Sequence, residues 1–189
     1  MTMSATDHQV RDRLSRVGIQ CLWQPSPNHN SRPADAPIDT LIVHYTALEF
    51  EASITHLSCP EKGVSTHYVV DRDGTLVQLV SLSRRGWHAG MSSLHGRPDV
   101  NSYSVGLDLV FVPATDREFT AVQYRVLGQL TRALLAILPI STSNIVGHED
   151  VALPPGRKTD PGPAFNWTRY FSEADLEGAS PLVLEADRG

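Results

Sequence analysis

The chain has 189 residues, 41% hydrophobic and 20% charged, which is typical of one soluble globular domain. The 16 basic and 21 acidic residues give a formal net charge of −5, so charge gives no reason to expect binding to nucleic acid or to an anionic membrane. No segment approaches the ~20 apolar residues of a membrane span, and the N-terminus lacks the apolar core of a secretory signal. We therefore expect a cytoplasmic protein, or a periplasmic one if the natural chain carries an export signal.

Cysteine and histidine are the residue types of special chemical interest in this composition. Cys21 and Cys59 form no CxxC pair, and we expect free thiols rather than a disulfide, which favours a reducing compartment. The 8 histidines make a metal site worth considering.

We divide the chain into a polar N-terminal segment over residues 1–35, one folded domain over residues 36–172 and a loosely held tail over residues 173–189.

The first half of the chain is predicted to contain a loop, a strand, a helix and a hairpin. Residues 24–37 are rich in proline and polar side chains, which is typical of a loop. The apolar, β-branched run over residues 38–46 predicts a buried strand, and residues 49–59 predict a short helix with one apolar face. Residues 65–80 form two β-rich runs around a DRDG turn, which predicts a hairpin.

The second half continues the alternation of strands and helices. We expect a loop, a strand, a long helix, a short strand and a final helical turn at residues 83–103, 104–112, 120–139, 144–150 and 165–171. Thr120 and Gln123 give the long helix a capping box at its start, and Pro139 ends it. Interleaved strands and helices predict a single α/β (α+β) domain, in which a mixed central β-sheet is flanked by helices.

Three residues on or beside rigid elements are candidate metal ligands: His44, His148 and Asp160. His44 lies near the end of the first predicted strand, His148 follows the short strand, and Asp160 lies in a KTDPGP turn whose prolines restrict the backbone. Catalytic zinc is commonly held by three such side chains. Spacing alone does not define the site, because the sequence has no HExxH or CxxC pattern, and each histidine alone can equally be a hydrogen-bonded structural residue.

Asp108 is a carboxylate inside a largely apolar predicted strand. Strict alternation places it on one face with Gly106 and Val110, opposite a face of larger apolar residues. A buried carboxylate destabilises a fold unless it is paired or hydrogen-bonded. We therefore consider three interpretations of this residue: a solvated face, a buried salt bridge, and a general base or orienting group whose pKa is set by its surroundings.

Other polar and aromatic residues fit a cleft without defining one. Lys158, two residues before Asp160, can stabilise a developing oxyanion or be an ordinary exposed lysine. Trp87 and His88 stand in a GWHAG segment and can form a cleft wall, although tryptophan more often belongs to the core. His67, on the first strand of the hairpin, can face the same site or be a satisfied interior histidine.

Five motifs occur in series along the chain: VHYTA at 43–47, VSTHYVVDRDGTLVQLV at 64–80, GWHAG at 86–90, NSYSVGLDL at 101–109 and GHEDVALPPGRKTDPGPAFNW at 147–167. Together, over roughly residues 38–170, they resemble the zinc-dependent N-acetylmuramoyl-L-alanine amidases. The similarity is greatest to the Gram-negative enzymes that process anhydro-muropeptides, and phage amidase lysozymes and peptidoglycan recognition proteins are more distant relatives. The resemblance implies a zinc amidase catalytic domain, of the peptidoglycan-recognition-protein fold, over residues 36–172.

The resemblance implies one zinc ion held by His44, His148 and Asp160. It implies hydrolysis of the amide bond between N-acetylmuramic or anhydro-N-acetylmuramic acid and L-alanine of the peptidoglycan stem peptide, in cell-wall recycling or turnover. The family's lysine corresponds to Lys158. Its catalytic carboxylate, usually glutamate, corresponds to Asp108, which keeps the charge but is shorter by one methylene.

The resemblance also implies that four residues lie near the substrate groove: His67, Trp87, His88 and Asn101. In the implied mechanism, Asp108 takes a proton from zinc-bound water and passes it to the leaving amine, while zinc and Lys158 stabilise the oxyanion. Three functions are then to be compared: a muropeptide amidase, a catalytically weak peptidoglycan-binding module on the same fold, and a zinc peptidase acting within the stem. We expect the amidase, because all three ligands and Lys158 are present, acting as a monomer on muropeptide or peptidoglycan.

Overall fold

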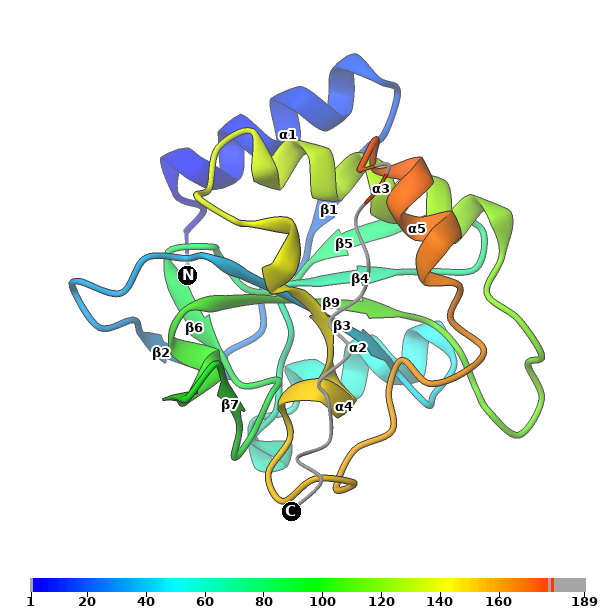
Figure 1. Ribbon diagram of the computed structural model, residues 1–189. Helices are drawn as coiled ribbons and strands as arrows, with labels where there is room; N and C mark the ends of the chain where they lie inside the picture. The colour runs from blue at the N-terminus through cyan, green and yellow to red at the C-terminus, as the bar shows by residue number, and fades with distance from the viewer. Residues whose placement is uncertain (1, 177, 179–189) are drawn as a thin grey trace.

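A six-stranded mixed sheet forms the centre of the protein in the computed structural model, which describes residues 2–176 and residue 178 (Figure 1). The strand order is β1-β5-β4-β9-β3-β10. β4 and β5 pair antiparallel, and each other neighbouring pair in this sheet is parallel. The strands are β1 (Cys21–Trp23), β3 (Thr40–Tyr45), β4 (Tyr68–Val70), β5 (Leu76–Gln78), β9 (Ser104–Leu109) and β10 (Ile145–Gly147). This mixed sheet and the β4–β5 hairpin confirm the predicted fold class.

Helices cover both faces of the sheet (Figure 1). On one face lie α1 (Ala5–Arg16), α3 (Ala121–Leu135) and α5 (Trp167–Glu173), and on the other lie α2 (Phe50–Ser58) and the short α4 (His148–Val151). Two small two-stranded sheets join β2 (His29–Ser31) to β6 (Arg84–Gly86) and β7 (Ser93–Leu94) to β8 (Arg97–Pro98). Short 3-10 turns occur at Pro60–Lys62, Val100–Ser102 and Thr142–Asn144.

The alternation of side chains along β3 and β9 divides the core between the two faces. Val43 and Leu107 are fully buried in the main cluster beneath α1, α3 and α5. Ile42 and Val110 point the other way, into two smaller clusters on the face of α2 and α4. The second face is therefore less completely filled with apolar side chains, and it is the face on which the polar candidates of both strands lie.

The long helix begins as predicted but ends earlier. Thr120 Oγ1 accepts a hydrogen bond from the Gln123 N–H at 3.1 Å, and Gln123 Oε1 accepts one from the Thr120 N–H at 3.0 Å, so the capping box is confirmed. The helix ends at Leu135, before Pro139. The cause is a tightened turn, in which the N–H of Ile137 and that of Leu138 both donate to the Leu134 carbonyl, at 3.0 and 2.8 Å.

The polar N-terminal segment contains three elements that the sequence patterns do not indicate, α1, β1 and β2. Val10 and Leu14 of α1 are fully buried in the main core. Asp7 is also fully buried, where it accepts hydrogen bonds from the Gln78 side-chain amide at 2.6 Å and the Leu82 N–H at 2.9 Å. The segment before residue 35 therefore packs on the same core as the rest of the chain.

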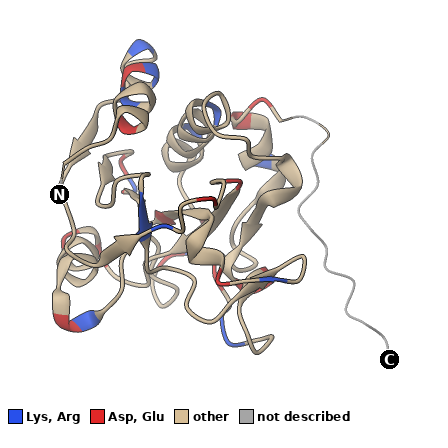
Figure 2. Ribbon diagram, turned by 90° about the vertical axis from the view of Figure 1, so that its left-hand side faces the viewer, with Lys and Arg blue, Asp and Glu red and all other residues tan. Residues whose placement is uncertain are grey.

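The tail predicted over residues 173–189 lies largely outside the described residues, which omit residue 177 and residues 179–189. Within the described part, Ala174 is buried and Leu176 packs against the main core. None of the helices in the described chain combines the length and apolar character needed to cross a bilayer. Basic and acidic segments are interspersed over the ribbon (Figure 2).

Candidate metal centre

Two parallel strands bring the candidate histidines together. β10 pairs with β3 in a register that sets Gly147 opposite Val43, so the next residue of each strand is a histidine. His44 is the penultimate residue of β3, and His148 begins α4 directly after β10. The carboxyl ends of neighbouring parallel strands meet at one edge of a sheet, which is where open α/β sheets commonly bind ligands. Each of the two histidines is only 3% exposed.

The loop that carries Asp160 is held against the same edge by its backbone. The Glu149 N–H donates to the Asp160 carbonyl at 2.9 Å. A Cβ atom at Gly147 would lie only 2.7 Å from Cδ of Pro161, so the glycine permits the loop to pack directly on the end of β10. Asp150 Oδ2 accepts from the Gly147 N–H at 2.7 Å and fixes the turn between β10 and α4.

The side chains of His44, His148 and Asp160 point their donor atoms at one another. The His44 and His148 Nδ1 atoms are 3.1 Å apart, and Asp160 Oδ2 lies 2.9 Å from the first and 3.0 Å from the second. These atoms form a buried group with the composition and spacing of a metal site. The sequence-predicted ligand set is therefore assembled in space, across separations of 104 and 116 residues.

The chemistry of these three donors fits a cation better than it fits hydrogen bonds alone. If both Nδ1 atoms carried hydrogens toward Asp160, the two N–H groups would face each other across 3.1 Å. A cation that accepts a lone pair from each atom removes this conflict. Two imidazole nitrogens and one carboxylate oxygen are a ligand set that zinc uses in catalytic sites.

Asp108 lies on the strand next to His44. The β3–β9 register sets it directly opposite His44, and its side chain is 7% exposed. The predicted alternation is confirmed, because Leu107 and Leu109 lie in the main core while Asp108 lines a cavity on the other face. Burial excludes the solvated face. Within the described residues Asp108 Oδ2 has no hydrogen-bond partner, and Asp108 forms no salt bridge there, so a structural ion pair does not explain it.

The pKa values of these groups follow from burial and from their neighbours. Burial raises the pKa of Asp108, and His44 offsets part of this effect. Burial also opposes protonation of His44, but Asp108 and Asp160 outweigh it and raise the pKa of His44. Burial and His44 lower the pKa of His148. For Asp160, burial is outweighed by the adjacent His148 and His44 rings, which hold its pKa below the ordinary range.

A cavity of about 390 Å³ opens above this group. Lys158, which is exposed, lines it together with Asp108 and the three candidate ligands. Trp87 and His88, predicted to lie near the substrate groove, also line it. Trp87 donates its indole N–H to Asn30 Oδ1 at 2.9 Å, which leaves the half-buried ring at the cavity wall.

Two of the residues predicted near the substrate groove lie behind the cavity wall. His67 is fully buried, and its Nδ1 accepts from the Gly106 N–H at 3.0 Å; burial and Arg32 lower its pKa to about 3. Asn101 is 4% exposed, and its Oδ1 accepts from the N–H groups of His88 and Ala89 at 3.1 and 2.8 Å. These contacts support the walls of the cavity.

Two residues that line the cavity, Arg157 and Tyr45, were not assigned to the site by the sequence analysis. Arg157 donates to the backbone carbonyls of Ala89 and Met91, at 3.0 and 2.8 Å, and so ties the loop before Lys158 to the GWHAG segment. Tyr45, at the end of β3, shares a 3.2 Å hydrogen bond with Thr159. Arg157 and Tyr45 each lie within one of the five motifs, which was the available signal, but their contacts depend on the tertiary fold.

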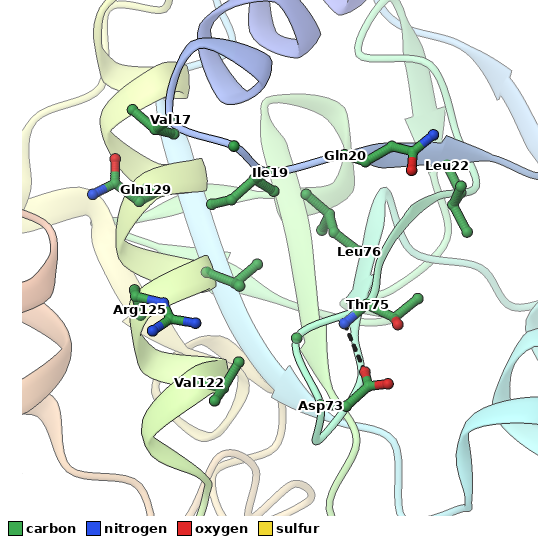
Figure 3. A pocket seen from close by; sticks show the side chains of 13 residues that line it. Val17, Ile19, Gln20, Leu22, Asp73, Thr75, Leu76, Val122, Arg125 and Gln129 are labelled. Carbon is green, nitrogen blue, oxygen red and sulfur yellow. Dashed lines mark hydrogen bonds between the residues drawn. The ribbon is translucent and has the colours of Figure 1, made fainter.

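A larger cavity, of about 500 Å³, lies elsewhere and shares no lining residue with the first. Figure 3 shows Val17 and Ile19 from the segment after α1, Thr75 from the hairpin turn and Val122 from α3 around it. Its carboxylate, Asp73, accepts a hydrogen bond from the Thr75 N–H at 2.8 Å and belongs to that turn. No group of candidate metal ligands among the described residues lies here, so the smaller cavity is the candidate site.

Comparisons with known proteins point to one family. A family model described as N-acetylmuramoyl-L-alanine amidase matches residues 34–163. The chain is 38% identical over 170 residues to the 1,6-anhydro-N-acetylmuramyl-L-alanine amidase AmpD of Escherichia coli K12, covering 77% of this chain and 87% of that protein.

Two solved structures with related sequences share the fold. A crystal structure of a selenomethionine AmpD derivative matches with a TM-score of 0.70 at 32% identity, covering 81% of this chain and 93% of that one. The N-acetylmuramyl-L-alanine amidase AmiD from E. coli, in complex with the substrate anhydro-N-acetylmuramic acid-L-Ala-D-γ-Glu-L-Lys, matches with a TM-score of 0.65 at 31% identity, covering 76% and 60%.

Proposed function

Because the chain belongs to the N-acetylmuramoyl-L-alanine amidase family, as its five motifs predict, we propose that it hydrolyses the amide bond between anhydro-N-acetylmuramic or N-acetylmuramic acid and L-alanine of the stem peptide, in cell-wall recycling or turnover. Each residue that we assign to the reaction lies within the proposed catalytic domain, residues 36–172. The names of the relatives support anhydro-muropeptides as the substrate class.

One observation carries this proposal: two Nδ1 atoms and one carboxylate oxygen lie 2.9–3.1 Å from one another in a cavity that Asp108 and Lys158 also line. We assign a single zinc ion to His44, His148 and Asp160. A zinc ion held by these residues would supply a Lewis acid for the scissile carbonyl and would lower the pKa of water at the site toward neutrality.

Asp108 acts as the general base. Its carboxylate lines the cavity beside the candidate ligands and forms no salt bridge in the described chain, so it is available to accept a proton from the attacking water. Burial raises its pKa, which makes the carboxylate a better proton acceptor and then a usable acid. The same group delivers the proton to the amine of L-alanine as the amide bond breaks.

Lys158 and the cavity wall act on the substrate rather than on the water. The ammonium group of Lys158 is exposed at the cavity, where it stabilises the negative charge that develops on the carbonyl oxygen. Trp87 offers an apolar ring at the opening, suited to packing against a sugar or lactyl group. His67 and Asn101 support this wall from behind.

The test is incubation of the purified protein with anhydro-N-acetylmuramic acid-L-Ala-D-γ-Glu-L-Lys, with products identified by mass spectrometry. We expect release of intact tripeptide, loss of this activity with a chelator, and recovery when zinc is restored. Binding without cleavage would instead identify a peptidoglycan-binding module, and shortened peptides would identify a peptidase acting within the stem. Tripeptide release that persists after complete metal removal would contradict the zinc assignment.

The proposed setting is the cytoplasm, and the proposed state is a monomer. Cys21 and Cys59 are both unpaired in the structure, which suits a reducing compartment. Cell fractionation with a tagged chromosomal copy tests the compartment, and light scattering during size-exclusion chromatography tests the mass in solution. Recovery in the periplasmic fraction, or a mass of two chains, would contradict the respective assignment.

A further inference from the structure

One short loop, residues 87–89, contacts the second ring nitrogen of both candidate histidine ligands. His148 Nε2 lies 3.1 Å from the Ala89 carbonyl oxygen. His44 Nε2 lies 3.1 Å from His88 Nδ1. A ring nitrogen that donates on one side leaves the other nitrogen of a neutral imidazole as a lone pair. The partners at Nε2 therefore decide whether Nδ1 can bind a metal.

For His148 the direction of the hydrogen bond is fixed. The Ala89 carbonyl can only accept, so His148 Nε2 carries the hydrogen and Nδ1 keeps its lone pair. That lone pair points into the group formed with His44 and Asp160. The backbone of the loop thus selects the metal-binding tautomer of this histidine, and the Arg157 guanidinium donates to the same carbonyl oxygen at 3.0 Å.

For His44 the partner is a second imidazole, so two directions are possible. If His88 donated to His44 Nε2, the neutral His44 ring would carry its hydrogen on Nδ1 and would be unable to bind a metal. If His44 donates instead, His88 Nε2 carries the remaining hydrogen and faces Ser104 Oγ at 3.2 Å, which can accept it. The chain from His44 through His88 to Ser104 therefore satisfies both rings in the metal-binding arrangement.

We propose that His88 and the Ala89 carbonyl are positioning groups that hold His44 and His148 in the tautomer with Nδ1 free for zinc, and that Asn101 holds this loop in place. The inference rests on the proposed zinc site and assigns no contact with substrate to Asn101. Metal-ligating histidines generally depend on such partners at their other nitrogen.

The loop is held in place by contacts to its backbone and to the His88 ring. The single Asn101 Oδ1 accepts from both the His88 and the Ala89 N–H groups, while Ser65 Oγ accepts from the Trp87 N–H at 3.0 Å. A Cβ atom at Gly106 would lie 2.7 Å from Cγ of His88, so the imidazole packs directly on the backbone of β9. Both ends of the His88 residue, backbone and ring, are therefore constrained.

The experiment measures zinc affinity in the absence of substrate, by competition of metal-free protein with a chromophoric chelator. The variants are His88→Leu, which removes the acceptor, and His88→Asn, whose amide oxygen can replace Nδ1. We expect His88→Leu to weaken zinc binding by about 10- to 100-fold and His88→Asn to stay within about fivefold of the parent. A His88→Leu affinity within about twofold of the parent, or an equal loss in both variants, would overturn the proposal.

A second measurement does not depend on how the variants fold. In the zinc-loaded parent, ¹⁵N-resolved NMR of the imidazoles should place the hydrogens of His44, His148 and His88 on Nε2. A hydrogen on His88 Nδ1 would overturn the assignment. A parent that binds no zinc would contradict the proposed function itself, whereas a zinc-binding parent with an insensitive His88→Leu variant would contradict only the role of His88.

Discussion

His44 and Asp108 lie directly opposite each other on the adjacent parallel strands β3 and β9. Neighbouring strands are about 4.8 Å apart, so this register places a metal ligand and the proposed general base on the same face, at the same height. A slip of one residue would turn Asp108 toward the apolar core and remove it from the site. Strand pairing, rather than loop geometry, therefore sets the relation between metal and base.

Asp108→Asn tests the proposed base with little change in shape. We expect kcat to fall by about 10²- to 10⁴-fold while one zinc remains bound, because the amide cannot accept the proton. Turnover of muropeptide by mass spectrometry and zinc content by atomic absorption measure the two effects. A variant with near-normal turnover would remove Asp108 from the mechanism.

The pH dependence of the same pair of proteins gives an independent check. In the metal-free protein burial raises the pKa of Asp108, although His44 offsets part of this effect. In the zinc-loaded enzyme activity should fall as the pH decreases and Asp108 is protonated, and this acid limb of kcat/KM should be absent from the residual rate of Asp108→Asn. A raised folded pKa also means that ionisation of Asp108 opposes folding above that pKa, so the metal-free variant should unfold at the same or a higher temperature at neutral pH.

Asp108→Glu restores the residue that is usual in the family. The side chain lines a cavity of about 390 Å³, so an added methylene does not overpack the core. We expect turnover equal to or above that of the parent, with an unchanged thermal midpoint. An inactive variant that still binds zinc would show that this site is adapted to the shorter carboxylate, and would argue against a simple gain in reach.

Lys158→Ala tests the proposed oxyanion contact. We expect kcat to fall by about 10- to 100-fold with unchanged zinc content, because the ammonium group contributes only as charge builds on the carbonyl oxygen. Lys62→Ala is the matched control, since Lys62 is also exposed but does not line the cavity. Equal activity of the two variants would show that Lys158 has no part in the reaction.

The elements around the site were predictable because their patterns are local. The alternation in residues 104–112 identified the apolar and polar faces of β9, and the Thr120–Gln123 pair located the start of α3. α1 was not predicted because only two of its three buried residues, Val10 and Leu14, are apolar. The third is the charged Asp7. Such a helix can be recognised only when the hydrogen-bond donors to its buried carboxylate are known.

The site itself was only partly predictable, for a similar reason. Residue chemistry suggested His44, His148 and Asp160 singly, but their convergence depends on the pairing of β10 with β3 across about a hundred residues, which no local pattern encodes. The motif resemblance supplied that link. It also suggested His67 and Asn101 as residues near the substrate; in the structure both are buried and neither lines the cavity, an arrangement that only tertiary packing reveals.

Asp7→Ala tests whether one buried carboxylate stabilises the packing of α1 on the rest of the domain. Asp7 accepts hydrogen bonds from the Ser4 N–H, the Gln78 side-chain amide, the Ser81 hydroxyl and the Leu82 N–H. Its removal leaves buried donors unsatisfied, so we expect a loss of about 2–4 kcal/mol in the free energy of unfolding, measured with urea. Asp12→Ala, an exposed change on the same helix, should cost less than about 0.5 kcal/mol.

The effect of Asp7 should also depend on pH. Burial would raise its pKa, but the hydrogen bonds from Leu82, Ser81 and Ser4 outweigh this and lower it. The stabilisation is therefore present above the unfolded pKa and is lost as the pH falls through the lower folded value, so the difference between the parent and Asp7→Ala should shrink in acid. Because α1 does not line the candidate site, kcat/KM at 25 °C should stay at the parent value. An unfolding free energy equal to that of Asp12→Ala would contradict this stabilising role of Asp7.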